Sequence, residues 1–283
     1  MATISRRNFI KSAVALTTAP MLSHAAVTSP KPTLKFIHVT DSHMDLGDEN
    51  SVDAMRLMVD YVNKHYPDLD FVLFGGDNFN NNAPGDKDAR AFKEIIDKLQ
   101  APTYLVRGNK ESSPKPADDP QNLDDFIQMF VKGKKELTIQ GKDWAFEKKG
   151  YQILGLDSNI EHQNNGRYTQ ETLDFAEHKL QNGKPTVILN HHPYTNYWGG
   201  KEEKDIHKYV LNNTKEAQKR LFGYSNLILT LSGHKHIDSV TKIGHVDVIV
   251  TRGFVRPLDL DMYPMRYIEI NDNNIREKLI YTS

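Results

Sequence analysis

The chain has 283 residues, of which 38% are hydrophobic and 26% charged, and its formal net charge is -1. This composition is typical of a soluble globular protein with enough residues for one large or two modest domains. The near balance of charge argues against a nucleic-acid polymer as partner, and no apolar run reaches the roughly 18 residues of a membrane helix. Because the chain has no cysteine, disulfides, thiolate nucleophiles and zinc–thiolate sites are excluded.

The first residues have the three-part layout of an export signal. Basic Arg6, Arg7 and Lys11 precede an uncharged stretch, 12–22, which is followed by small residues that suit cleavage. The heptapeptide SRRNFIK, 5–11, resembles the twin-arginine signal that directs folded bacterial proteins to a dedicated export machinery. A disordered basic tail or a short amphipathic helix is the alternative interpretation.

The export interpretation sets the expected domain boundaries. We expect a signal peptide over 1–26, a linker over 27–33 and one domain over 34–283. The mature protein would then be periplasmic, with no stable membrane insertion after the signal is removed. The export machinery would be its partner in transit.

Apolar runs of strand length alternate with helical patterns after residue 33. The helical patterns begin with one over 52–62, after a possible Ser51 cap, and continue at 91–99 and 173–180. Two late runs, 267–270 and 275–280, predict a hairpin around NDNN. Strands alternating with helices predict an α/β layered architecture. The other predicted strands cover 34–39, 70–74, 103–106, 151–156, 186–189, 227–231 and 246–251.

Polar residues follow five of these strands at the point where each strand ends. Ligands bind to open α/β sheets beyond the carboxyl ends of the strands, so these side chains are expected to share one edge. Each motif alone also fits a turn, a helix cap or a surface histidine pair, and Asn109 also fits a left-handed turn residue. The residues are Asp41 and His43, Asp77, Asn109, His191 and His192, and His234 and His236.

The combination of these residues points to metal binding. Imidazole nitrogens with carboxylate and amide oxygens suit Mn, Fe or Zn, and seven such ligands fit two metals that share a carboxylate better than one. In Asp41-x-His43 and His234-x-His236, the spacing of two predicts side chains on the same side of an extended backbone.

The series D-x-H, G-D, G-N, H and G-H-x-H, each after a strand over roughly 34–255, resembles the calcineurin-like metallophosphoesterase superfamily. Gly166-Arg167-Tyr168 before a helix, followed by NHHP, is similar to the bacterial branch of cyclic-nucleotide and glycerophosphodiester phosphodiesterases. The resemblance implies two mixed β-sheets sandwiched between helices, an αββα fold.

The resemblance also implies the roles of the ligands. One metal ion would be held by Asp41, His43, Asp77 and His236, and the other by Asp77, Asn109, His191 and His234. Asp77 would bridge the two ions, whose identity as Mn, Fe or Zn stays open, and a hydroxide shared between them would attack phosphorus.

Lys110 departs from the family pattern G-N-H-[DE], in which a histidine follows the asparagine. It could act as a catalytic cation beside the phosphate, or it could point to solvent and pair with Glu111 while His192 takes the catalytic role. A third interpretation is a protein that binds metal and phosphate without turnover.

Several residues near the motifs are candidates for substrate contacts. Tyr194, Tyr197 and Trp198 could stack a base or sugar, or pack their loop against the domain. The asparagines 78 and 80–82 could bind a polar head group or form a polar turn. Two further candidates for phosphate contacts are Arg107 and Arg256.

The expected function is that of an exported, dimetal-dependent phosphoesterase acting on a small-molecule phosphate ester, with phosphodiesters favoured. A phosphomonoesterase, a nucleotide pyrophosphatase and a catalytically silent metal and phosphate binder are the alternatives.

Overall fold

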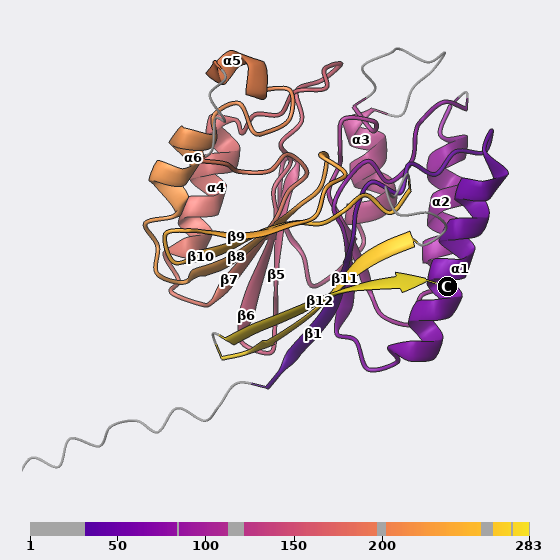
Figure 1. The fold of residues 1–283 in the computed structure, drawn as a ribbon, viewed down its shortest axis with the longest axis horizontal. Helices are drawn as coiled ribbons and strands as arrows, with labels where there is room; N and C mark the ends of the chain where they lie inside the picture. The colour runs from indigo at the N-terminus through magenta and orange to yellow at the C-terminus, as the bar shows by residue number, and fades with distance from the viewer. Residues whose placement is uncertain are drawn as a thin grey trace, which may run out of the picture. The chain divides into compact units, whose positions relative to one another are not determined.

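Two mixed β-sheets form the centre of the fold, and helices cover their outer faces (Figure 1). The structure is a computed structural model, and it describes 32–83, 85–112, 122–196, 202–255, 263–272 and 274–282. These residues belong to one compact unit. The predicted αββα sandwich is therefore confirmed, whereas the predicted signal peptide, 1–26, lies outside the described residues.

The first sheet has five strands in the order β12-β11-β1-β2-β3. β1 runs parallel to β2, and β2 runs parallel to β3, while β11 pairs antiparallel with both β1 and β12. The hairpin predicted around NDNN is β11–β12 and is longer than expected. The strands are β1 (Leu34–Val39), β2 (Phe71–Phe74), β3 (Thr103–Leu105), β11 (Tyr263–Asn271) and β12 (Asn274–Thr282).

The second sheet has seven strands in the order β4-β5-β6-β7-β8-β10-β9. Its central strands β6, β7, β8 and β10 are parallel, and β4, β5 and β9 pair antiparallel at the two sides. The strands are β4 (Thr138–Gln140), β5 (Asp143–Lys148), β6 (Tyr151–Gly155), β7 (Thr186–Leu189), β8 (Leu227–Ser232), β9 (Ser239–Ile243) and β10 (Val246–Val250).

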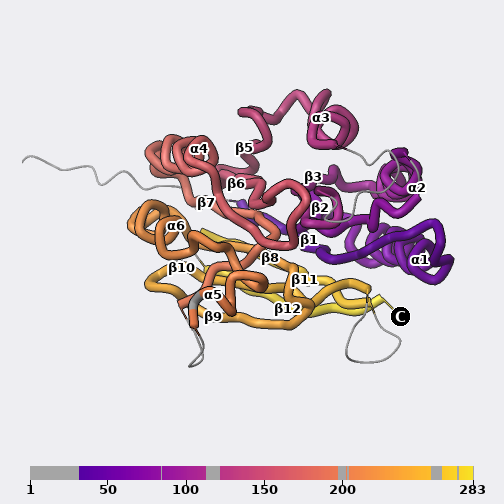
Figure 2. The backbone as a smooth tube through the Cα atoms, turned by 90° about the horizontal axis from the view of Figure 1, so that it is seen from above, coloured from indigo at the N-terminus to yellow at the C-terminus, as the bar shows by residue number. Residues whose placement is uncertain are grey.

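The helices lie in two groups on opposite sides of the sheets, α1 and α2 on one side and α4 and α6 on the other (Figure 2). Asp48, rather than the predicted Ser51, caps α1, because its side chain accepts the Asn50 N–H and Ser51 lies inside the helix. The helices are α1 (Glu49–His65), α2 (Lys87–Ile96), α3 (Leu123–Phe126), the π-helix η1 (Ile127–Val131), α4 (Gln170–Leu180), α5 (Glu203–Ile206) and α6 (Thr214–Leu221).

Two apolar clusters hold the layers together. Along β7, Val187 and Leu189 belong to a cluster that joins both sheets with α1 and α2, whereas Ile188 belongs to the cluster that contains the apolar residues of α4 and α6. Successive strand side chains point to opposite faces, so a strand covered on both faces is apolar throughout. The four residues of β7 are accordingly all buried.

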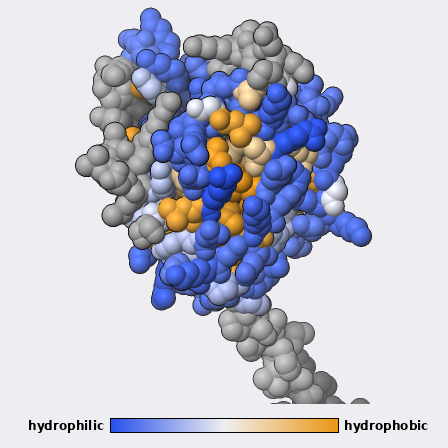
Figure 3. Space-filling view, turned by 90° about the vertical axis from the view of Figure 1, so that its right-hand side faces the viewer, coloured by the Kyte–Doolittle hydropathy of each residue, from blue (hydrophilic) through white to orange (hydrophobic). Residues whose placement is uncertain are grey.

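The surface on the α1 and α2 side is mostly hydrophilic, with a band of hydrophobic side chains exposed among the charged ones (Figure 3). Leu57 of α1 is one of the exposed large hydrophobic residues. Among the described residues, no helix combines the length and the hydropathy needed to cross a bilayer.

Candidate metal centre

The seven predicted ligands meet beyond the carboxyl ends of five strands, as expected for parallel strands of an α/β fold. β1, β2 and β3 supply residues from the first sheet, and β7 and β8 supply residues from the second. The loops after β1 and β2 are also paired, since the Asp41 N–H donates to Gly76 O at 2.9 Å. The site therefore lies where the two sheets come together.

One group of ligand atoms contains Asp41, His43 and His236. Nε2 of His43 lies 3.0 Å from Nε2 of His236, which lies 3.3 Å from Asp41 Oδ1. Asp77 Oδ2 is 3.7 Å from the same nitrogen of His43. These four residues are the ones that the resemblance assigns to one metal ion.

A second group contains Asp77, Asn109, His191 and His234. Nε2 of His191 lies 3.5 Å from Asp77 Oδ1 and 3.2 Å from Asn109 Oδ1. Nδ1 of His234 lies 3.0 Å from the same Asn109 oxygen. Asp77 thus presents one oxygen to each group, which is the position required of a bridging carboxylate.

Hydrogen bonds outside the site fix the orientation of three of the imidazole rings. His191 Nδ1 donates to Gly75 O at 2.9 Å, His234 Nε2 to Lys208 O at 2.9 Å, and His43 Nδ1 to the Asn80 amide oxygen at 3.0 Å. The other nitrogen of each ring therefore turns toward carboxylate or amide oxygens, which only accept, and that of His43 also faces His236 Nε2. A buried set of facing acceptors requires a cation, so the residues fit a dinuclear metal site.

The protonation of the buried groups agrees with this arrangement. Burial alone would raise the pKa of Asp77, but the His191 ring outweighs it and holds the pKa well below the ordinary value. Burial lowers the pKa of His43 and of His234. Burial opposes protonation of His191 as well, but in the metal-free chain the Asp77 carboxylate outweighs it and raises the pKa of His191 to about 9.

Five of the seven predicted ligands have left-handed backbone conformations. Asp41, His43, Asp77, His234 and His236 have φ between 43° and 67° and are five of the nine non-glycine residues with positive φ in the described part of the chain. Such residues are uncommon and concentrate at functional sites. The predicted extended backbone of the two spaced pairs is wrong, and His234 and His236 accordingly reach different groups. Asn109 is not a left-handed turn residue.

Two glycines allow the loops to close on the ligands. A Cβ at Gly108 would overlap the backbone nitrogen and the carboxylate of Asp77, and a Cβ at Gly233 would overlap the Asp41 carboxylate. The glycines of the G-N and G-H-x-H motifs are therefore needed for close approach.

Glu111 connects the loops that carry Asp77 and Asn109. Its carboxylate is buried and accepts N–H groups of Asp77 (3.0 Å), Asn78 (2.6 Å), Phe79 (3.2 Å) and Gly108 (2.7 Å). Burial and the neighbouring Asp77 raise the pKa of Glu111 to about 7. The sequence marked this residue only as the acidic position of a motif, and the strand-end pattern gave no signal for the clamp.

Lys110 lies at the edge of the site. Its backbone N–H donates to Asp77 Oδ1 at 2.7 Å, and its side chain is partly exposed. The expected alternative of a pair with Glu111 is wrong, because the Glu111 oxygens accept backbone N–H groups instead. A catalytic role for Lys110 stays a prediction.

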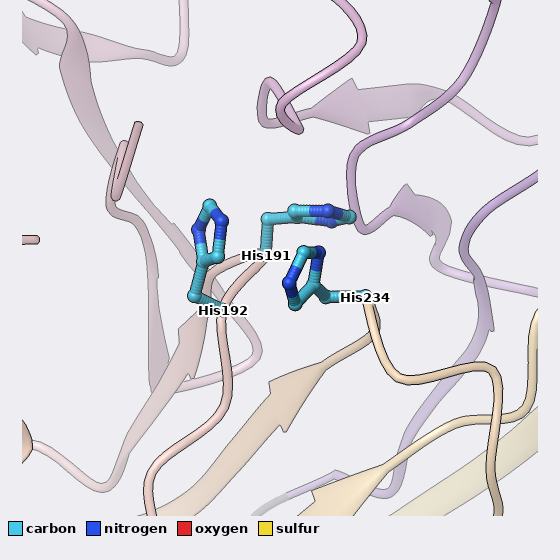
Figure 4. A group of neighbouring side chains, drawn as sticks. All are labelled: His191, His192 and His234. Carbon is cyan, nitrogen blue, oxygen red and sulfur yellow. The ribbon is translucent and has the colours of Figure 1, made fainter. Parts of the chain in front are cut away.

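His192 lies beside His191 and His234, with ring centroids 4.9 and 4.4 Å away (Figure 4). Nε2 donates to Asn164 O at 3.1 Å, so Nδ1 accepts from the Ser158 hydroxyl at 2.8 Å. Burial, together with the neighbouring His234, keeps the pKa well below the ordinary value. Both ring nitrogens are therefore occupied by protein groups, and the catalytic role of His192 also stays a prediction.

Two of the predicted substrate contacts are buried in the protein interior. Tyr194 is buried and shares a hydrogen bond with Tyr168, 2.7 Å between the hydroxyls, so it packs in the interior. Arg107 is buried and donates to Asp157 and Glu161 at 2.7 and 2.6 Å, which leaves it no access to a substrate. Three further candidates lie outside the described residues: Tyr197, Trp198 and Arg256.

The sequence was compared with family models and with curated proteins. The model of the calcineurin-like phosphoesterase family matches residues 34–238. The chain belongs to this family. Membership and the ligand clusters together support a metal-dependent phosphoesterase with a dinuclear centre. Among the curated proteins no sequence matches significantly.

Solved structures share the fold of this chain at low sequence identity. A dimetal phosphatase from Danio rerio is 13% identical with a TM-score of 0.67, covering 90% of this chain and 100% of that one. A purple acid phosphatase from Lupinus luteus seeds is 12% identical with a TM-score of 0.60, covering 89% of this chain and 52% of that one. An inner-membrane-complex anchor of Plasmodium is 15% identical with a TM-score of 0.52, covering 89% and 86%.

Proposed function

We propose that the chain is an exported phosphoesterase that uses two metal ions to hydrolyse small phosphodiesters. The observation that carries the proposal is the set of facing acceptor atoms on seven residues, divided into two groups by Asp77. When bound, two divalent cations would supply Lewis acidity that activates water and neutralises charge on the phosphoryl group. Their charge exceeds that of Asp41 and Asp77, so the loaded site would attract an anionic ester.

The protein groups have distinct roles in this proposal. Asp41, His43 and His236 would hold one ion, Asn109, His191 and His234 would hold the other, and Asp77 would contact both. Lys110 would stabilise the negative charge that develops on the departing oxygen, since its ammonium group makes no hydrogen bond or ion pair with another described residue. His192, in its fixed Nε2–H form, would support the ligand loop.

The proposal of export rests on the predicted signal peptide and not on the metal site. The basic Arg6 and Arg7 resemble a twin-arginine signal, and a route for folded proteins suits a chain that acquires its metals before it crosses the membrane. Replacing both arginines with lysine should leave the chain in the cytoplasm of a bacterial host. Equal periplasmic recovery of the two forms would contradict the export proposal.

The activity is tested with paired aryl phosphate monoesters and diesters, the mature chain, and its measured metal content. Diester hydrolysis that disappears in Asp77→Ala is the expected result, and the ratio of the two rates decides between diesterase and monoesterase. Two bound metals without hydrolysis would favour the silent binder, an alternative suggested by Lys110. Hydrolysis gained only in Lys110→His would support that alternative.

A further inference from the structure

The three oriented ligand histidines are not held in the same way. Main-chain oxygens, which no substitution can remove, accept from His191 and His234. The oxygen that accepts from His43 belongs to the Asn80 side chain, 3.0 Å from His43 Nδ1. The orientation of His43 therefore depends on a replaceable group.

The Asn80 amide is itself held in one orientation. Its Nδ2 donates to Asp45 Oδ2 at 3.1 Å, and an ionised carboxylate can only accept, so the amide oxygen is the atom that faces His43. Asn82 donates to the same Asp45 oxygen at 2.6 Å, and the Gly47 N–H donates to the other oxygen at 2.8 Å. Asp45 thus stays fixed when one partner is lost.

We propose that Asp45 and Asn80 are positioning residues that hold His43 in its Nδ1–H form, so that Nε2 presents its lone pair to one of the two metal sites. The inference rests on the proposed function only in its use of the metals, because the form of the ring is a property of the metal-free protein. It assigns a role to the asparagine-rich segment after Asp77. The sequence allowed two interpretations of this segment, binding of a polar head group and a plain polar turn.

The two sites then respond separately to substitution. Asn80→Leu keeps the branched shape and the number of heavy atoms but removes the acceptor, and loss of such a partner typically weakens metal binding about 10- to 100-fold. Only the site of His43 should weaken. Asn80→Asp keeps an acceptor for His43 but loses the bond to Asp45 and places a second carboxylate beside it, so binding at that site should weaken less than in Asn80→Leu.

The first measurement is nitrogen NMR of the histidine rings in the metal-free chain. His43 should be the Nδ1–H form in wild type and in Asn80→Asp, and should lose that preference in Asn80→Leu. Finding His43 in the Nε2–H form in wild type would overturn the proposal, whether or not the protein binds metal.

The second measurement is calorimetric titration with Mn²⁺. Asn80→Leu should lose affinity for one equivalent, the same one that His43→Ala loses, and should keep the other. Unchanged binding of both equivalents, or equal weakening of both, would contradict the assignment. A wild-type chain that takes up no Mn²⁺ would instead disprove the proposed function, and the NMR result would still decide the role of Asn80.

Asn82→Leu is the matched control. It removes a partner of Asp45 by the same substitution, at an exposed position that makes no hydrogen bond to His43. Its ring form and both Mn²⁺ affinities should match wild type. A loss as large as that of Asn80→Leu would show that disturbance of the Asp45 cluster, and not the contact with His43, is responsible.

Discussion

Replacement of Glu111 should disturb the geometry of the metal site while all of its ligands are kept. In Glu111→Gln an amide N–H₂ must face backbone N–H groups, and each buried donor left without a partner costs about 1–3 kcal/mol. The variant should unfold at lower urea concentration and bind Mn²⁺ more weakly, although all seven ligands are present. Urea unfolding of the metal-free chain and Mn²⁺ titration measure the two effects.

Asp88 offers a control of the same chemistry. Its buried carboxylate also accepts backbone N–H groups, from Leu46 (3.1 Å), Asn82 (2.8 Å) and Ala83 (3.0 Å), but none of these is a metal ligand, whereas Glu111 accepts the N–H of Asp77 itself. Asp88→Asn should lose comparable stability without a comparable loss of Mn²⁺ affinity. If both variants lost the same Mn²⁺ affinity, Glu111 would have no special role in positioning.

At this scale the sequence predicted the seven residues that converge but not what holds them. Asp41 and His234 follow strands within recognisable motifs, so position along the chain was informative. Glu111 and Asn80 act through hydrogen bonds to groups more than 30 residues away in sequence, and no local pattern encodes such a contact. Left-handed backbone at Asp41 was equally hidden, because aspartate is enriched at positive φ but most aspartates do not adopt it.

At the scale of elements, the pairing of β5 with β6 requires a residue without a side chain, Gly155. Gly155 lies opposite Trp144, and a Cβ there would overlap the indole ring, whose N–H donates across to Leu105 O of β3 at 2.8 Å. Gly155→Ala should therefore destabilise the fold by about 1–3 kcal/mol, measured by urea unfolding. Gly223→Ala, where a Cβ meets nothing within 4 Å, should change little. Equal effects would disprove the packing argument.

The start of β5 should make stability depend on pH. Burial and the charge of Asp157 raise the pKa of Asp143 from 3.8 to about 7. Between these values the folded chain holds a proton that the unfolded chain releases, so this group makes stability fall as pH rises. Asp143→Asn keeps an acceptor for the Asp157 N–H and lacks the titration. The free energy of unfolding of Asp143→Asn minus that of wild type should be larger at pH 8 than at pH 5. An equal difference at both pH values would refute this.

The predicted elements were right where both faces are covered. β1 and β7 have the predicted bounds because each is mostly apolar and almost entirely buried. β4 was missed because its three residues are exposed, and β9 because its central residues are exposed at the edge of a sheet. β5 was missed as well, although its first four residues are buried, because charged residues stand at both of its ends. Edge strands carry polar residues and lack the apolar run that marks a buried strand.

For the whole molecule, metal binding should appear as stability. A ligand that binds only the folded chain, present at 100 times its dissociation constant, adds about 2.7 kcal/mol, which for a domain of this size corresponds to roughly 5–10 °C in Tm. Calorimetry should therefore show a higher Tm with Mn²⁺ and a lower one after chelation. Asp77→Ala should respond to neither, and a full response in that variant would place the metal elsewhere.

The fold class and the family were predictable from the whole sequence because motif order and strand order together are restrictive. The order of strands within the two sheets was not, since β11 enters beside β1 from the far end of the chain. Such long-range pairing depends on which apolar faces can cover one another. The signal peptide and the periplasmic location stay predictions.

The left-handed backbone of these five ligands also costs folding stability. Each such residue costs roughly 1–2 kcal/mol, a penalty that glycine escapes. A lineage with no use for the metals would gain stability by drifting to glycine at Asp41, His43, Asp77, His234 or His236. This sequence has a candidate ligand, and not glycine, at all five positions. A library selected for folding alone is expected to lose these residues first.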